Sequence, residues 1–85
     1  MSRLSKILEK LLDPKSTITF QELEYLLGKL NYIEKKTGKT SGSRKAYIHQ
    51  TSKHIIRIHK PHPGNELKKY VKLYIIAELK KQNLI

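Results

Sequence analysis

The chain contains no cysteine and no tryptophan among its 85 residues, and it has a single methionine and a single phenylalanine. Without cysteine, neither a disulfide nor a thiolate-ligated zinc ion can stabilise the fold. A chain of this length is one domain by size, and it buries roughly 60–65% of its unfolded surface. Its stability therefore comes from packing, with or without a core shared with a partner chain.

Long apolar runs are also missing. The N-terminal segment, M-S-R-L-S-K-I-L-E-K-L-L, includes Glu9 and is too interrupted for the apolar core of a signal peptide. No segment approaches the ~20 apolar residues of a membrane span. We therefore expect a cytoplasmic protein that does not associate with a membrane.

Acidic residues are scarce. Seven Asp and Glu stand against 18 Lys and Arg, which gives a net charge of +11. Between Lys35 and Gly64 there is no carboxylate, and the cations of this segment are Lys35, Lys36, Lys39, Arg44, Lys45, Lys53, Arg57 and Lys60. A surface of one sign attracts polyanions. The pattern favours binding of nucleic acid or of an acidic partner protein over a surface that is merely basic for solubility.

The periodicity of apolar residues predicts six elements. Helical spacing predicts a first helix that ends near Asp13, formed by Leu4, Ile7, Leu8, Leu11 and Leu12. The capping box T-F-Q-E at residues 19–22 begins a second helix, which ends at Asn31. Strands are expected at residues 32–36, 46–48 and 54–59, with a turn at 50–53. A last helix begins between residues 66 and 70 and ends near Asn83. This order, α-α-β-β-β-α, predicts an α+β domain with the helices packed on one face of a three-stranded antiparallel sheet.

The sequence lacks residues that several known catalytic and metal-binding patterns require. The G-K-T at residues 38–40 resembles the end of a Walker A loop, but the first glycine of that motif would fall at Ile33. The only aspartate is Asp13, so no Ser-His-Asp arrangement can be built. No Asp, Glu or Cys lies near the histidines to complete a metal site, and we predict neither a metal nor a cofactor. The histidines are His49, His54, His59 and His62.

The stretch T-G-K-T-S-G-S-R at residues 37–44 suits contact with phosphate. Small residues let backbone N–H groups approach an anion closely, and the neighbouring cations add charge. Taken alone, Gly38 and Gly42 favour an ordinary hairpin turn between two strands over a phosphate site. The predicted RNA-binding surface comprises Lys39, Ser43, Arg44, Lys45, Arg57, His59, Lys60 and His62.

Two segments of the chain resemble the HicA family of bacterial toxins. They are G-S-R-K-A-Y at residues 42–47 and I-I-R-I-H-K-P-H-P-G-N-E-L-K at residues 55–68. The family has a Gly-Ser-His-x-x-aromatic motif at the start of one strand. A later strand leads into a His-Pro-Gly/Asn-x-Glu-Leu-Lys-like segment before a terminal helix, and the ending N-L-I at residues 83–85 also suits the family. The resemblance covers roughly residues 20–85, which leaves residues 1–13 as an additional N-terminal helix.

The resemblance implies a fold like that of a double-stranded-RNA-binding domain. It implies a toxin of a type II toxin–antitoxin system that acts as an mRNA interferase, a metal-independent endoribonuclease that needs no cofactor. It also implies a HicB-like antitoxin protein as a partner.

One departure from the family motif concerns catalysis. The family's catalytic histidine, in Gly-Ser-His, is replaced here by Arg44. Arginine remains protonated in proteins, so Arg44 can hold a phosphate and stabilise charge but cannot act as a base. If chemistry survives, His59 is the leading proton carrier, with His49 and His62 as weaker candidates. The alternatives are a non-catalytic RNA-binding domain and a module that binds an acidic, antitoxin-like protein.

Overall fold

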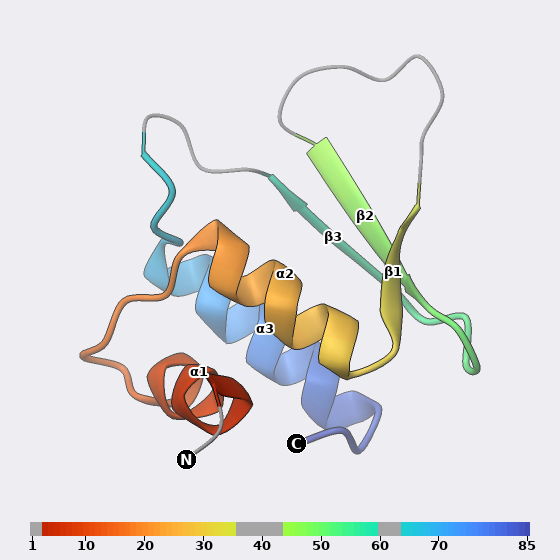
Figure 1. The fold of residues 1–85 in the computed structure, drawn as a ribbon, viewed down its shortest axis with the longest axis horizontal. Coiled ribbons are helices and arrows are strands. Elements are labelled where there is room, and N and C mark those ends of the chain that lie inside the picture. Colours follow the sequence, from red (N-terminus) through yellow and green to blue (C-terminus); the bar gives the residue numbers. More distant parts are fainter. Residues whose placement is uncertain (1–2, 36–43, 60–63) are drawn as a thin grey trace.

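A computed structural model describes residues 3–35, 44–59 and 64–85 of the chain, with only the backbone described for Arg44. In chain order the elements are α1 (Arg3–Leu12), α2 (Phe20–Lys29), β1 (Tyr32–Lys35), β2 (Arg44–His49), β3 (Ile55–His59) and α3 (Lys69–Lys81) (Figure 1). The predicted α+β class and the order α-α-β-β-β-α are confirmed. In the described part of the chain, no helix combines the length and the apolar character needed to cross a membrane.

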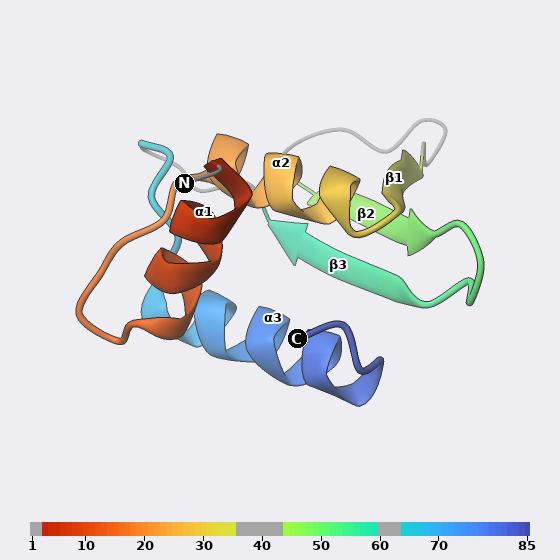
Figure 2. The same cartoon turned by 60° about the horizontal axis from the view of Figure 1, so that its bottom comes forward.

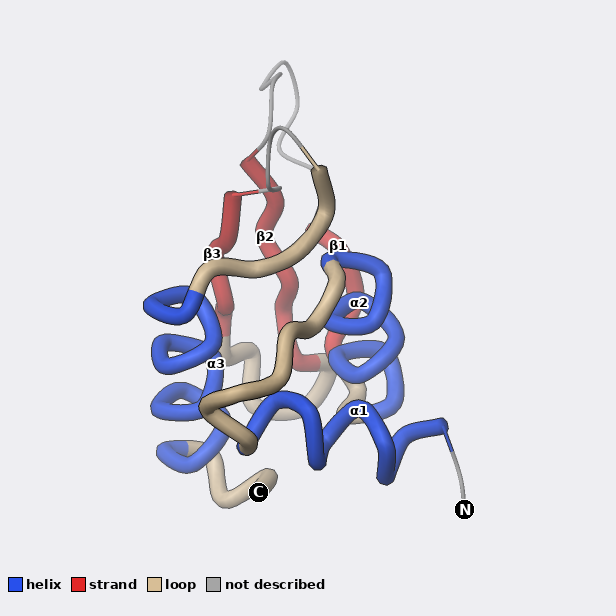
Figure 3. The backbone as a smooth tube through the Cα atoms, turned by 90° about the vertical axis from the view of Figure 1, so that its left-hand side faces the viewer, coloured by secondary structure: helices blue, strands red, loops and turns tan. Residues whose placement is uncertain are grey.

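The three strands form an antiparallel sheet in the order β1-β2-β3. Both α2 and α3 pack on the same face of this sheet, with α2 near β1 and α3 near β3 (Figure 3). Helix α1 crosses α2 and α3 on their side away from the sheet (Figure 1). Within residues 3–35, 44–59 and 64–85, no helix lies on the opposite face of the sheet, so this is the face that we consider for ligand binding.

Local signals in the sequence explain where α2 begins and ends. The Thr19 hydroxyl accepts a hydrogen bond from the Glu22 backbone N–H at 3.1 Å, and the Glu22 carboxylate accepts one from the Thr19 N–H at 3.0 Å. This reciprocal capping box satisfies two N–H groups that the first helical turn would otherwise leave unpaired. After the helix, Asn31 takes a left-handed backbone with φ of 71°, which turns the chain into β1.

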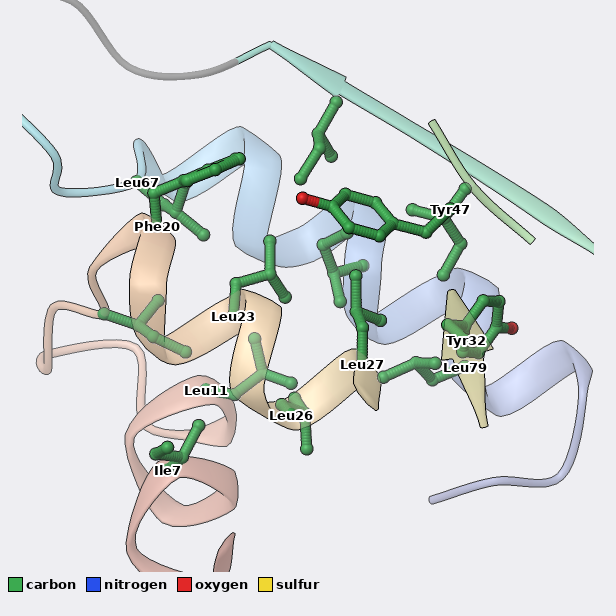
Figure 4. Packing of buried hydrophobic residues seen from close by; sticks show 14 residues of the cluster. Ile7, Leu11, Phe20, Leu23, Leu26, Leu27, Tyr32, Tyr47, Leu67 and Leu79 are labelled. Carbon is green, nitrogen blue, oxygen red and sulfur yellow. The ribbon is translucent and has the colours of Figure 1, made fainter. Parts of the chain in front are cut away.

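The core lies between the helices and the inner face of the sheet (Figure 4). Strand residues Tyr32, Tyr47 and Ile56 are buried against the helices, because alternate strand positions point to the same face. The fully buried side chains are Ile7, Leu11, Ile18, Phe20, Leu23, Leu26, Leu27, Ile56, Ile75 and Leu79. Burial of Tyr47 and its 2.7 Å hydrogen bond to Glu24 raise the pKa of this tyrosine far above its ordinary value.

The strand boundaries differ slightly from those predicted. Strand β2 begins at Arg44, two residues before the predicted start at Ala46, because Arg44 and Lys45 pair in register with β3. Strand β3 begins at Ile55, since His54 belongs to the hairpin turn. The prediction relied on apolar residues, which are found only in the buried part of each strand. Backbone pairing continues beyond them, through the polar residues at the strand ends.

A buried lysine attaches α1 to the rest of the domain. Lys72 of α3 is only 5% exposed. Its ammonium group donates hydrogen bonds to the carbonyl oxygens of Asp13 at 2.8 Å and Ser16 at 2.5 Å. These carbonyls follow the C-terminus of α1, where unpaired carbonyl groups carry partial negative charge and favour a cation. The connection between α1 and α2 is thereby fixed to α3.

A second polar network joins the hairpin turn to α3. The Tyr32 hydroxyl and His54 Nδ1 form a hydrogen bond of 2.7 Å, and His54 Nε2 donates to the Glu78 carboxylate at 2.9 Å, because a carboxylate can only accept. The carboxylate also accepts from Lys81 at 3.1 Å. The hydrogen bonds from His54 and Lys81 hold the pKa of Glu78 below its ordinary value of 4.5.

This lowered pKa predicts a pH-dependent contribution to stability. Glu78 binds its proton more weakly in the folded chain than in the unfolded chain, so its contribution is present above about pH 4.5 and is lost as the pH falls through the folded pKa. We expect the free energy of unfolding to fall less steeply from about pH 6 to about pH 3 in Glu78→Gln than in the wild type. Urea unfolding at several pH values measures the two slopes. Glu9→Gln, at an exposed glutamate of α1, is the matched control and should follow the wild type.

Candidate nucleic-acid interface

The helix-free face of the sheet carries two distinct rows of residues. The register aligns Ile33, Ile48 and Ile55 across the three strands, and it aligns Lys35, Ala46 and Arg57 in the row two residues further along. Because side chains alternate between faces, these residues lie on the side opposite Tyr47 and Ile56. The outer face is therefore apolar toward the β2–β3 turn and cationic toward the other end of the sheet.

The cationic end is free of acidic residues among the described positions of the outer face. Lys35, Arg57 and His59 are exposed there, and no Asp or Glu belongs to the outward-pointing positions of β1, β2 or β3. The glutamates nearest in sequence, Glu24 and Glu34, lie toward the helix side. Clustered positive charge without a nearby carboxylate is the electrostatic arrangement that attracts phosphate groups.

Lys45 differs from the other predicted RNA-binding residues. It shares the inner face with Tyr47, and its ammonium group lies 3.7 Å from the Glu24 carboxylate and 3.5 Å from that of Glu34. The ammonium also lies 5.7 Å from the centre of the Phe20 ring. Two carboxylates offset its charge locally. We therefore count Lys45 as part of the helix–sheet packing and not as a phosphate contact.

Position 44, where the motif that this chain resembles has a histidine, lies directly opposite His59. Arg44 and His59 are cross-strand partners in the pairing of β2 with β3. Directly opposed residues in an antiparallel pair have Cβ atoms about 4.5–5.5 Å apart and point to the same face. The Cβ atom of a histidine at position 59 therefore lies close to that of a histidine at position 44, and both side chains would extend from the same face of the sheet. No hydrogen-bond partner for His59 occurs among the described residues, so its imidazole is available to a ligand.

The other described histidines have structural roles. The Nδ1 atom of His49 accepts hydrogen bonds from the backbone N–H groups of Thr51 at 3.2 Å and Ser52 at 3.1 Å, which closes the β2–β3 turn. His54 is held between Tyr32 and Glu78. Both lie at the opposite end of the hairpin from Arg44, roughly 17 Å along the strand by the rise per residue. Their contacts with the turn, Tyr32 and Glu78 hold both imidazoles away from the cationic end of the outer face.

The segment that follows residue 63 is anchored to the start of α2. The backbone N–H of Phe20 donates to the Asn65 carbonyl at 2.6 Å, and that of Leu67 donates to the Ile18 carbonyl at 2.9 Å. The Glu66 carboxylate accepts from the Thr17 hydroxyl at 3.3 Å, and Gly64 has φ of 84°, where glycine is favoured. The G-N-E-L residues at positions 64–67 thus hold this segment against the start of α2.

The remaining predicted residues lie outside the described part of the chain. They are Gly38 and Gly42 and four predicted RNA-binding residues, namely Lys39, Ser43, Lys60 and His62. Both of these segments continue from the cationic end of the sheet, since one follows Lys35 and precedes Arg44 and the other follows His59. Lys35 was missed as a site residue, although it begins the carboxylate-free segment. Lys35 lies in the same cross-strand row as Arg57, with Ala46 between them. This alignment depends on the strand register, which cannot be predicted from the amino-acid composition.

Comparison of the chain with protein-family models, with curated proteins and with solved structures finds no match in any of the three. Among the described residues, no three His, Cys, Asp or Glu side chains come together in a way that could hold a metal ion.

Proposed function

We propose that this chain binds RNA through the cationic end of its outer sheet face and cleaves it without a metal, as a HicA-like toxin of a toxin–antitoxin pair. The observation that carries the proposal is the pairing of His59 with position 44 beside Arg57, on a face without carboxylates. The motif resemblance supports the choice of RNA. Messenger RNA would be met in the cytoplasm, and a HicB-like antitoxin would be the natural protein partner.

In the proposed site, a few residues share proton transfer and phosphate binding. Metal-free cleavage requires a base for the 2′-hydroxyl proton, an acid for the leaving oxygen and positive charge at the phosphate. Imidazole can perform either proton transfer near neutral pH, and guanidinium groups hold phosphate oxygens in a bidentate manner. His59 takes a proton-transfer role in this proposal. Arg44 and Arg57 bind and neutralise the phosphate.

A second function follows from the same surface. Without proton transfer, the face would still bind RNA through its cations, and the protein would be a non-catalytic RNA-binding domain. Replacement of the motif histidine by Arg44 is the specific observation that favours this alternative. A module that uses the basic face to bind an acidic protein is the third alternative.

Salt-dependent RNA binding tests the placement of the interface. We expect Arg44→Ala and Arg57→Ala each to weaken binding of a single-stranded RNA about fivefold at low salt. Each should also reduce the slope of log affinity against log salt by about 0.7–1, because one phosphate contact is lost. Fluorescence anisotropy at several salt concentrations measures both quantities.

The matched control for these variants is Lys6→Ala, which removes one charge from the exposed face of α1. Lys6 lies on the helix that is most distant from the outer face of the sheet (Figure 1). If Lys6→Ala reduces affinity and salt slope as much as Arg57→Ala, binding follows net charge alone and the interface is wrongly placed.

A further inference from the structure

The C-terminal helix α3 is apolar on two faces. Its inner face packs into the core through Ile75 and Leu79. Its outer face carries Tyr70, Leu73, Tyr74 and Ala77, which follow the spacing i, i+3, i+4 and i+7 of a continuous helical stripe. These four residues are all exposed, with Tyr70 at 69% and Leu73 at 56%. We refer to them as the α3 stripe. No element of the described chain covers it.

The stripe adjoins the edge of the sheet. Helix α3 lies beside β3, the edge strand (Figure 2). The Tyr74 hydroxyl accepts a hydrogen bond from the Arg57 backbone N–H at 3.3 Å. This contact joins the stripe to the strand that carries Arg57, although the stripe itself lies on the helix and not on the outer face of the sheet.

Positive charge borders the stripe along one side and at its C-terminal end. Helical geometry places Lys69 and Lys80 along that side and Lys81 at the C-terminal end. The one carboxylate of α3, Glu78, is already held by His54 and Lys81. The stripe is therefore an apolar surface with a basic rim, which is the complement of an apolar surface with an acidic rim.

A second copy of this chain fits the stripe poorly. A two-fold contact between two α3 stripes would bring Lys69, Lys80 and Lys81 of each copy close to the same residues of the other. Like charges facing one another across an interface oppose association, and each chain carries +11 overall. Charge complementarity thus selects a foreign acidic partner over self-association.

We propose that the α3 stripe is a docking site for an acidic amphipathic helix of another protein. The partner helix would place apolar residues against Leu73, Tyr70 and Tyr74, as in other helix-in-groove and helix-pair contacts. Its Asp and Glu residues would face Lys69 and Lys80. This site differs from the RNA-binding face, and it does not depend on the function proposed for that face.

Binding of designed peptides tests this proposal. The probe is a fluorescent peptide of about three heptads, with leucine at helical spacing and glutamate at most other positions. One control peptide replaces the leucines with serine and keeps the charge, and another replaces the glutamates with lysine. We expect the full-length protein to bind the acidic leucine peptide at least about tenfold more tightly than either control, because both apolar contact and charge are required.

Protein variants then locate the contact. Leu73→Ser should weaken peptide binding about tenfold or more, whereas RNA affinity should stay unchanged. Leu12→Ser is the matched control, since Leu12 of α1 is 51% exposed and Leu73 is 56% exposed. Unchanged peptide binding in Leu73→Ser, or an equal loss in Leu12→Ser, would overturn the proposal. So would a dimer in sedimentation equilibrium that Leu73→Ser dissociates, because the occupant would then be a second copy.

Discussion

Replacement of Lys72 with methionine is expected to lower the free energy of unfolding by about 2–4 kcal/mol. Methionine fills a similar volume, so the change removes the ammonium group without opening a large cavity. Two charge-assisted hydrogen bonds, to the carbonyls of Asp13 and Ser16, are lost, and a hydrogen bond to a charged group contributes about 1.5–3 kcal/mol. The Ser16 carbonyl is then left without a donor among the described residues, and the Asp13 carbonyl keeps only the hydrogen bond from the Ser16 N–H at 3.2 Å. For a domain of this size the loss corresponds to roughly 10 °C or more in Tm.

Lys69→Met is the control for this variant, because Lys69 is an exposed lysine three residues away on the same helix. Lys69 lies in the first turn of α3, where a cation opposes the helix dipole, so its removal should leave stability unchanged or slightly increased. Thermal unfolding compares the variants. Amide hydrogen exchange in Lys72→Met should accelerate first in α1, the element that Lys72 attaches. Equal unfolding of Lys72→Met and the wild type would show that burial of Lys72 costs as much as its hydrogen bonds contribute.

Local patterns in the sequence predicted the elements of this fold well. The capping box of α2, the left-handed Asn31 and the alternation in β3 depend on neighbouring residues, so each could be recognised without tertiary information. The final helix began within the predicted window. The strand ends were less well predicted, because Arg44 and Lys45 belong to β2 through backbone pairing with β3, and their polar side chains give no strand signal.

The buried polar contacts could not be predicted from sequence. A lysine within an apolar helical pattern indicates an exposed position, and the acceptors of Lys72 lie more than fifty residues away in the chain. The pairing of His54 with Glu78 depends in the same way on how α3 lies against the turn.

The candidate site was predictable in part. Alternation along β2 places Lys45 on the side of Tyr47, so its place on the inner face could have been inferred from the sequence. The pairing of position 44 with His59 could not, because the segment between β1 and β2 and the strand register both had to be known. Because positions 44 and 59 are neighbours on adjacent strands, the proposed proton-transfer role of His59 can be tested by moving the histidine from one position to the other.

Replacement of His59 with alanine is expected to reduce RNA cleavage by about 10²–10⁴-fold, the usual contribution of a positioned proton-transfer group. In the proposed reaction the 2′-oxygen attacks the adjacent phosphorus and the 5′-oxygen of the next nucleotide leaves, so that a 2′,3′-cyclic phosphate forms. His59 accepts the 2′-hydroxyl proton, and the leaving oxygen takes up a proton in exchange. The measurement is cleavage of a long single-stranded RNA in EDTA by purified protein, with RNA affinity measured alongside. Affinity should change little.

The cross-strand pair permits a sharper test of the same prediction. The double variant Arg44→His with His59→Ala moves the imidazole to the opposite strand while keeping it on the same face, so we expect cleavage to recover at least tenfold over His59→Ala alone. His49→Asn serves as the control, because the asparagine side-chain oxygen can still accept the turn N–H groups while the imidazole is removed. Full cleavage in His59→Ala would exclude a proton-transfer role for His59. Wild-type protein that binds RNA without cleaving it, while Arg44→His alone cleaves, would instead show that the arginine converts a nuclease site into a binding site.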